Sequence, residues 1–155
     1  MFNFFKKEEF KVVSPLSGKC INISEVPDKV FSAKLMGDGF AIIPNNNVVV
    51  APVSGDAESV FPTKHAVGIK TKEGIEVIIH VGIDTVELNG EGFKTFISQG
   101  DKVKAGQPII QFDKDVIEEK GYNLTTMVVF SAGYDKEINL DKENKDVTSG
   151  EVLIK

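Results

Sequence analysis

The chain has 155 residues, of which 41% are hydrophobic and 26% are charged, and its formal net charge is −5 at pH 7. This length supports one domain with a real hydrophobic core, and the composition is that of a soluble globular protein. The acidic balance and the lack of a long Lys/Arg cluster argue against nucleic acid as the main partner. No apolar run approaches the roughly 20 residues that span a bilayer, and the N-terminus lacks the pattern of a signal peptide, so we expect a cytoplasmic location.

Along the chain, residues 1–10 are predicted to be a short N-terminal tail and residues 11–155 a single domain. Short runs rich in Val, Ile and Phe then recur between clusters of Gly, Asn, Asp and Pro. The runs are KVVSPL, KCINI, FAIIP, NVVVAPV, AESVF, HAVGIKT, IEVIIHVGI, QPIIQF, MVVFSA and EVLIK. This spacing predicts an all-β fold, an antiparallel β-sandwich or barrel-sandwich, with only brief helical turns such as one over residues 116–120.

One sequence pattern occurs twice. The segment VVSPLSGKCINI near the start resembles VVAPVSGDAESV, which begins at Val49, and both contain the same Pro-x-Ser-Gly core. The repeat suggests that two similar half-motifs face each other in the sandwich. The single cysteine, Cys20, excludes an intramolecular disulfide and metal sites of the CxxC type, and it is expected to be a packed thiol.

The chain has two histidines, His65 and His80, in consecutive strand-like runs. If the turn between them is a loop of four residues or of two, the pairing places His65 directly opposite His80. Their Cβ atoms would then be about 4.5–5.5 Å apart on one face of the hairpin. A loop of three residues would instead send the two rings to opposite faces. The first two loop lengths therefore predict a pair of facing imidazoles.

A neutral imidazole nitrogen is a competent nucleophile toward a phosphoryl group, and its ordinary pKa of about 6.5 keeps it largely neutral near pH 7. A second imidazole beside it can donate a hydrogen bond to a phosphoryl oxygen. The residues alone leave open a second reading, in which both histidines are partly buried and serve only as satisfied structural groups.

The segments FPTKHAVGI and HVGIDTVELNGEGF, with MGDGFAI and APVSG upstream, closely resemble the glucose-type enzyme IIA of the bacterial phosphotransferase system. The resemblance covers about residues 12–155. It implies a phosphocarrier that accepts a phosphoryl group from the carrier protein HPr on His80 and passes it to a cysteine of the IIB domain of a sugar permease. It further implies that His65 assists the transfer and that Thr63 orients His65 by a hydrogen bond. Nδ1 of His80 would be held by the Gly82 carbonyl, and no cofactor is required.

The resemblance also implies a docking face for HPr and IIB, a shallow apolar surface around the histidines with acidic residues at its edge. The protein would be peripheral to the membrane through the permease. The apolar members carried over are Val30, Phe31, Leu35, Met36, Phe61, Val67 and Ile78, and the acidic members are Asp28 and Asp84. Lys64, directly before His65, adds a positive charge near the site.

Two other classes of protein compete with this reading. QGDKVKAGQPIIQFD resembles part of a lipoyl or biotinyl carrier domain, but no lysine at a tight hairpin tip precedes it. A zinc peptidase of the lysostaphin type would need a third protein ligand beside His65 and His80, such as Asp84, and the His-x-His pair of that family is absent. Adventitious or interfacial zinc binding by the two histidines remains an expectation.

Overall fold

The computed structural model describes residues 9–155, so residues 1–8 of the predicted tail lie outside the described residues. Phe10, inside the predicted tail, packs against the main core, and its ring centroid lies 5.8 Å from that of Tyr134. The packed domain therefore includes Phe10. Within the described part of the chain, no helix is long and apolar enough to cross a membrane.

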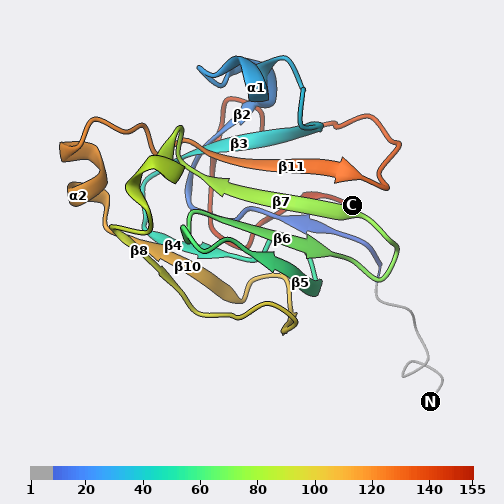
Figure 1. Cartoon of the computed structure of the whole chain (residues 1–155). Coiled ribbons are helices and arrows are strands. Elements are labelled where there is room, and N and C mark those ends of the chain that lie inside the picture. The colour runs from blue at the N-terminus through green and yellow to red at the C-terminus, as the bar shows by residue number, and fades with distance from the viewer. Residues whose placement is uncertain (1–8) are drawn as a thin grey trace.

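The all-β prediction is confirmed. In the described residues, eight strands form one long antiparallel sheet in the order β12-β2-β3-β11-β7-β6-β5-β9, a second sheet has the order β4-β10-β8, and β1 pairs with β13 (Figure 1). The strands are β1 (Val12–Val13), β2 (Gly18–Asn22), β3 (Asp38–Pro44), β4 (Val48–Val50), β5 (Gly55–Val60), β6 (Ala66–Lys70), β7 (Glu76–Val81), β8 (Phe93–Thr95), β9 (Lys102–Val103), β10 (Pro108–Phe112), β11 (Thr126–Ala132), β12 (Asp146–Val147) and β13 (Val152–Ile154).

The helical elements are short, as expected. Helix α2 (Lys114–Glu119) covers most of the segment in which a helical turn was predicted, and Asp113 caps its N-terminus by accepting a hydrogen bond from the Val116 N–H. Three others in residues 9–155 were not predicted: the 3₁₀ turns η2 (Ile23–Glu25) and η3 (Thr85–Leu88) and the helix α1 (Lys29–Ser32). Each spans about one turn, which is too short to produce a recognisable helical periodicity.

The two similar half-motifs do face each other. The Val13 N–H donates to the Pro52 carbonyl at 2.8 Å, and the Val50 N–H donates to the Pro15 carbonyl at 2.9 Å. Val13 and Val50 are equivalent positions in the repeat, and so are Pro15 and Pro52. The hydrogen bonds are therefore reciprocal, as expected for two copies related by an approximate two-fold axis.

The duplication extends further than the sequence pattern suggested. The Ser17 hydroxyl accepts a hydrogen bond from the Ser149 N–H at 2.8 Å, and the equivalent Ser54 hydroxyl accepts one from the Ala105 N–H at 2.9 Å. The strands that follow each repeat, β2 and β5, pair with β12 and β9 in the same way. A second pair of related segments, residues 101–110 and 145–154, thus completes the two halves.

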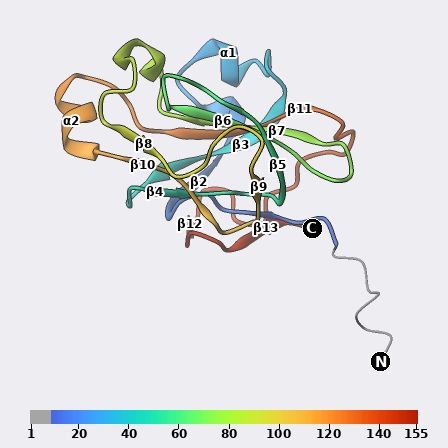
Figure 2. The same ribbon diagram turned by 60° about the horizontal axis from the view of Figure 1, so that its bottom comes forward.

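The buried hydrophobic residues of the described part of the chain form two clusters. The larger cluster combines side chains of the long sheet, such as Phe40 and Ile79, with side chains of the β4-β10-β8 sheet, such as Ile110. In Figure 2, β6, β7 and β11 of the long sheet lie above β4 of the second sheet, and this cluster fills the core of the sandwich between them. The smaller cluster lies on the other face of the long sheet, where α1 and η2 cover β2, β3 and β11. Its members are Ile21, Ile23, Val26, Phe31, Ala41, Met127 and Val129.

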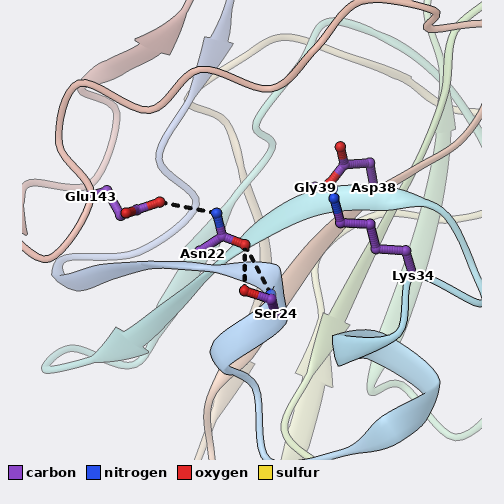
Figure 3. A network of polar contacts seen from close by, with 6 residues as sticks. All are labelled: Asn22, Ser24, Lys34, Asp38, Gly39 and Glu143. Carbon is purple, nitrogen blue, oxygen red and sulfur yellow. Dashed lines mark hydrogen bonds and ion pairs between the residues drawn. The ribbon is translucent and has the colours of Figure 1, made fainter.

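Polar contacts hold the segment from η2 to α1, which covers this outer face, in place (Figure 3). The Asn22 carboxamide oxygen accepts hydrogen bonds from the Ser24 N–H and hydroxyl at 3.0 and 2.9 Å, and its NH₂ group donates to Glu143 at 3.0 Å. At the other end, Nζ of Lys34 lies 3.5 Å from Oδ1 of Asp38. The same carboxylate oxygen accepts a hydrogen bond from the Gly39 N–H. The segment from η2 to α1 is thus tied at both ends beside the histidines described next.

Candidate functional site

The β6–β7 hairpin brings His65 and His80 together. Side chains of β7 alternate, so that Val77 and Ile79 are buried in the sandwich core while Ile78 and His80 lie on the outer face. His80 is opposite Ala66 on β6 and opposite Met127 on β11. Its ring therefore emerges next to the small cluster that α1 covers.

The predicted pairing of the two histidines is wrong by one residue. The Thr71 N–H donates to the Ile75 carbonyl, so the loop has three residues, and Ala66 rather than His65 is opposite His80. The predicted consequence of a three-residue loop, rings on opposite faces, is also wrong. The centroids of the His65 and His80 rings are 4.7 Å apart, with an angle of 84° between the ring planes.

The rings meet because His65 lies just before β6, outside the regular ladder. Lys64 has a left-handed backbone with φ of 61°, and its N–H donates to the Phe61 carbonyl at 2.8 Å. This tight turn frees His65 from strict strand alternation. Its carbonyl still accepts a hydrogen bond from the Val81 N–H at 2.7 Å, which anchors the backbone while the ring turns toward His80.

The proton on His80 is placed by its backbone partner. Nδ1 of His80 lies 2.8 Å from the Gly82 carbonyl oxygen, the contact that the resemblance implied. A carbonyl only accepts hydrogen bonds, so the neutral ring carries its proton on Nδ1 and leaves a lone pair on Nε2. His80 thus presents Nε2 as the nucleophilic nitrogen.

His65 has a partner of a different kind. Its Nδ1 lies 2.8 Å from Oγ1 of Thr63, so the predicted contact is confirmed. A hydroxyl can either donate or accept. When Thr63 donates to Nδ1, the neutral His65 ring carries its proton on Nε2 and can donate a hydrogen bond to an oxygen placed between the two rings. His65 is buried, with 3% of its surface exposed, which holds this ring in place.

Both imidazoles are held in the neutral form. Burial, and to a smaller extent the neighbouring His80, lower the pKa of His65 to about 4, while a backbone hydrogen bond with Thr63 acts the other way. Burial also lowers the pKa of His80, against the opposing effects of the Gly82 hydrogen bond and of the carboxylates of Asp28 and Asp84. A neutral His80 keeps its lone pair available at the pH of the cell.

Most of the apolar residues predicted for the docking face lie around the histidines or are exposed. Leu35, Val30 and Phe61 are 73%, 44% and 38% exposed. The Phe61 ring contacts His65 edge-on at 5.7 Å between centroids, and Met36 packs partly buried against the outer cluster. Ile78 is half-buried on the same face as His80.

Two predicted members of the docking face are not exposed. Val67 is fully buried in the sandwich core, because it points to the face opposite Ala66 and Gly68. Its assignment to the docking face is therefore wrong. Phe31 is also buried, and it forms the wall of the site, since its ring centroid lies 5.1 Å from that of His80.

The two predicted acidic residues lie at the edge of the site, close enough to influence the pKa of His80. Asp28 caps α1 by accepting a hydrogen bond from the Val30 N–H at 2.8 Å. Asp84 adopts a left-handed backbone, with φ of 60°, just before η3. The Asp28 carboxylate is therefore held by the helix that it caps, whereas the Asp84 carboxylate accepts no capping hydrogen bond from η3.

Nothing in the sequence indicated an exposed apolar residue next to the predicted edge residue Asp84. Val86 is 48% exposed on η3, two residues after Asp84. The pattern HVGIDTVELNGEGF contains it, but a lone valine in a motif gives no sign of whether it is buried. Its exposure beside an acidic edge residue adds it to the candidate docking face.

Within residues 9–155, no group of three or more His, Cys, Asp and Glu side chains is placed to hold a metal ion. The possible zinc ligation by His65 and His80 stays a prediction.

Comparison with known families gives a match over most of the chain. Residues 10–135 match the family described as "phosphoenolpyruvate-dependent sugar phosphotransferase system, EIIA 1". The glucose-specific EIIA component of Bacillus cereus is 49% identical over 126 residues, which are 81% of this chain and 76% of that protein.

A further relative contains additional domains. The glucose-specific EIICBA component of Staphylococcus saprophyticus is 41% identical over 150 residues, which are 97% of this chain but 22% of that protein. Among solved structures, glucose permease IIA from Mycoplasma capricolum has a TM-score of 0.86 and 39% identity, with 97% of each chain covered. The fold and the sequence thus point to the same group of proteins.

Proposed function

Since this chain belongs to the EIIA 1 family of the phosphoenolpyruvate-dependent sugar phosphotransferase system and is a phosphocarrier component of it, we propose that His80 is the residue that carries the phosphoryl group. The observation that carries the proposal is the contact between Nδ1 of His80 and the Gly82 carbonyl at 2.8 Å, because it leaves the free lone pair on Nε2. We propose phospho-HPr as the donor.

In the first transfer, Nε2 of His80 attacks the phosphorus of the donor phosphohistidine. The new P–N bond forms as the P–N bond of the donor breaks, and the donor imidazole departs with the electron pair. In the second transfer, a cysteine thiolate of a IIB domain attacks the same phosphorus, and Nε2 of His80 leaves. Each step exchanges one bond to phosphorus for another, so no cofactor is required.

His65 acts as the hydrogen-bond donor in both steps. The ring centroids are 4.7 Å apart, so a phosphoryl oxygen on Nε2 of His80 can reach the Nε2–H of His65. Thr63 sustains this arrangement, because its hydroxyl can donate to Nδ1. The hydrogen bond stabilises the negative charge that develops on the oxygens during transfer.

The docking face would serve both partners in turn. Exposed apolar side chains supply contact area, and Asp28 and Asp84 at the edge attract a partner with a basic surface. Fusion to IIB and IIC domains in the staphylococcal relative supports a IIB domain as the acceptor. The site of action would be the cytoplasmic side of the membrane, next to a glucose-family permease.

A reconstituted relay tests this function. The chain is incubated with phosphoenolpyruvate, enzyme I and HPr, and its mass is measured together with the acid and base stability of the adduct. One added phosphoryl group that is stable in base, lost in acid and absent in His80→Gln supports the proposal. An equally phosphorylated His80→Gln contradicts it, as does an unmodified wild-type chain beside fully phosphorylated HPr.

His65→Gln separates the two histidines in the same assay. We expect this variant to accept a phosphoryl group and to pass it slowly to a IIB domain. Normal transfer by His65→Gln would show that His65 is not the donor of the stabilising hydrogen bond.

A further inference from the structure

The turn that follows β7 determines how the Gly82 carbonyl faces His80. Strand β7 ends at Val81, so the direction of this carbonyl depends on the two peptide groups that flank Gly82. Gly82 has φ of 81°, a left-handed conformation that other residues rarely adopt. Glycine adopts this conformation without strain but adopts others as readily, so contacts from neighbouring groups select it.

The Thr85 side chain provides that support on one side. Thr85 is fully buried, and its hydroxyl donates a hydrogen bond to the Val81 carbonyl. The same peptide group donates its N–H, that of Gly82, to the Thr125 carbonyl at 3.1 Å. Both polar ends of the peptide between Val81 and Gly82 are therefore held.

The methyl group of Thr85 adds a steric contact. A β-carbon built on Gly82 would lie 2.5 Å from Cγ2 of Thr85, so this methyl group packs against the α-carbon of Gly82. One side chain thus holds both the carbonyl before Gly82 and Gly82 itself.

The second peptide group is held by a neighbouring loop. The Ile83 N–H donates to the Asn123 carbonyl at 2.9 Å, and the carbonyl of this peptide is the Gly82 oxygen that meets His80. The Asn123 side chain accepts hydrogen bonds from the N–H and hydroxyl of Thr125, which fixes the loop. Among these supports, Thr85 is the one whose hydroxyl can be removed with little change of shape.

We propose that Thr85 is a positioning residue for phosphoryl transfer, because it holds Gly82 and the peptide group before it so that the Gly82 carbonyl faces His80 and keeps the proton of His80 on Nδ1. The proposal rests on the assignment of His80 as the phosphoryl carrier. It assigns to Thr85 no contact with the phosphoryl group. Its effect is on the fraction of His80 that presents a free lone pair on Nε2.

The experiment compares three variants with the wild-type chain. T85V removes the hydroxyl and keeps the shape, and T85S keeps the hydroxyl. T71V is the matched control, because the buried Thr71 hydroxyl also forms a hydrogen bond to the backbone, with the Ile75 N–H at 3.1 Å, but at the far end of the same hairpin. Imidazole ¹⁵N spectra report the tautomer of His80, and the relay assay reports the rate of phosphorylation.

We expect the wild-type chain, T85S and T71V to show the Nδ1–H tautomer of His80. T85V should show a mixture of tautomers and a rate of phosphorylation lowered about tenfold, the effect of losing one well-placed hydrogen bond. A T85V chain with the wild-type tautomer and rate overturns the proposal, and so does a T71V chain that changes both as T85V does.

If T85V does not fold, a measurement on the unaltered chain tests the proposal instead. The hydroxyl proton of Thr85 should exchange slowly with water and show a coupling across the hydrogen bond to the Val81 carbonyl carbon. A freely exchanging hydroxyl overturns the proposal. The tautomer spectra need no phosphoryl donor. A wild-type chain that stays unphosphorylated in the relay assay therefore refutes the carrier role of His80, while the spectra still show whether Thr85 sets the tautomer.

Discussion

The buried His65 makes the stability of the fold depend on pH in a defined direction. Its pKa is lowered to about 4 in the folded chain, mainly by burial, whereas the unfolded chain has an ordinary value near 6.5. Well above pH 6.5, His65 is neutral in both the folded and the unfolded chain, so it does not make the free energy of unfolding depend on pH. Below about pH 6.5, His65 binds a proton in the unfolded chain but stays neutral in the folded chain, so the free energy of unfolding falls.

The size of the loss follows from the two pKa values. Linkage gives about 2 kcal/mol lost from this residue between pH 7 and about pH 5, and about 3 kcal/mol by about pH 4. The pH dependence of the whole protein sums over all of its ionisable groups. The contribution of His65 is therefore isolated by comparison with a variant that lacks only the titrating ring.

Urea unfolding of the wild-type chain and of His65→Gln at several pH values measures this contribution. Glutamine has no ionisation in the range, so the wild-type chain should lose about 2 kcal/mol more than the variant on going to about pH 5. Parallel pH profiles for the two proteins would refute the reasoning, because they would mean that His65 accepts a proton as readily in the folded chain as in the unfolded one.

Three substitutions test other parts of the account. Gly82→Ala places a β-carbon 2.5 Å from Cγ2 of Thr85 at a φ of 81°, so it should cost about 1–3 kcal/mol in urea unfolding and should also slow phosphorylation; wild-type stability would show that the turn adapts. Leu35→Lys, at a position 73% exposed, should raise the KM for phospho-HPr without changing the Tm, whereas Val152→Lys on β13 should change neither; equal KM values for the two would remove Leu35 from the docking face. Val67→Ala should lower stability by about 1–3 kcal/mol and leave the KM for phospho-HPr unchanged, and a changed KM at wild-type stability would return Val67 to the docking face.

The sequence was sufficient to predict the class of fold because strand runs and turn residues alternate along almost its whole length. The repeat around the two Pro-x-Ser-Gly segments was visible for the same reason, since both copies keep the proline and glycine. Its second half was not visible. Residues 101–110 and 145–154 share backbone hydrogen bonds but few side chains, and only the structure shows them to be equivalent.

The residues of the candidate site were predicted more accurately than their arrangement in space. The register of the hairpin depended on the length of its loop, and the residues of the turn permit more than one length. The left-handed backbone of Lys64, which returns His65 to His80 despite the shifted register, leaves no sign in the residue type, since lysine rarely adopts it. Val67 was assigned to the docking face by the resemblance, but the observed register, shifted by one residue from the predicted one, places it on the core face of the sheet.

The site of phosphorylation can be identified by nuclear magnetic resonance of the phosphorylated chain with ¹⁵N-labelled histidine. Coupling between phosphorus and nitrogen identifies the atom that carries the phosphoryl group. If His80 carries the phosphoryl group, we expect a coupling to its Nε2, while Nδ1 stays protonated and donates to the Gly82 carbonyl. A coupling to Nδ1 of His80, or to either nitrogen of His65, would contradict it.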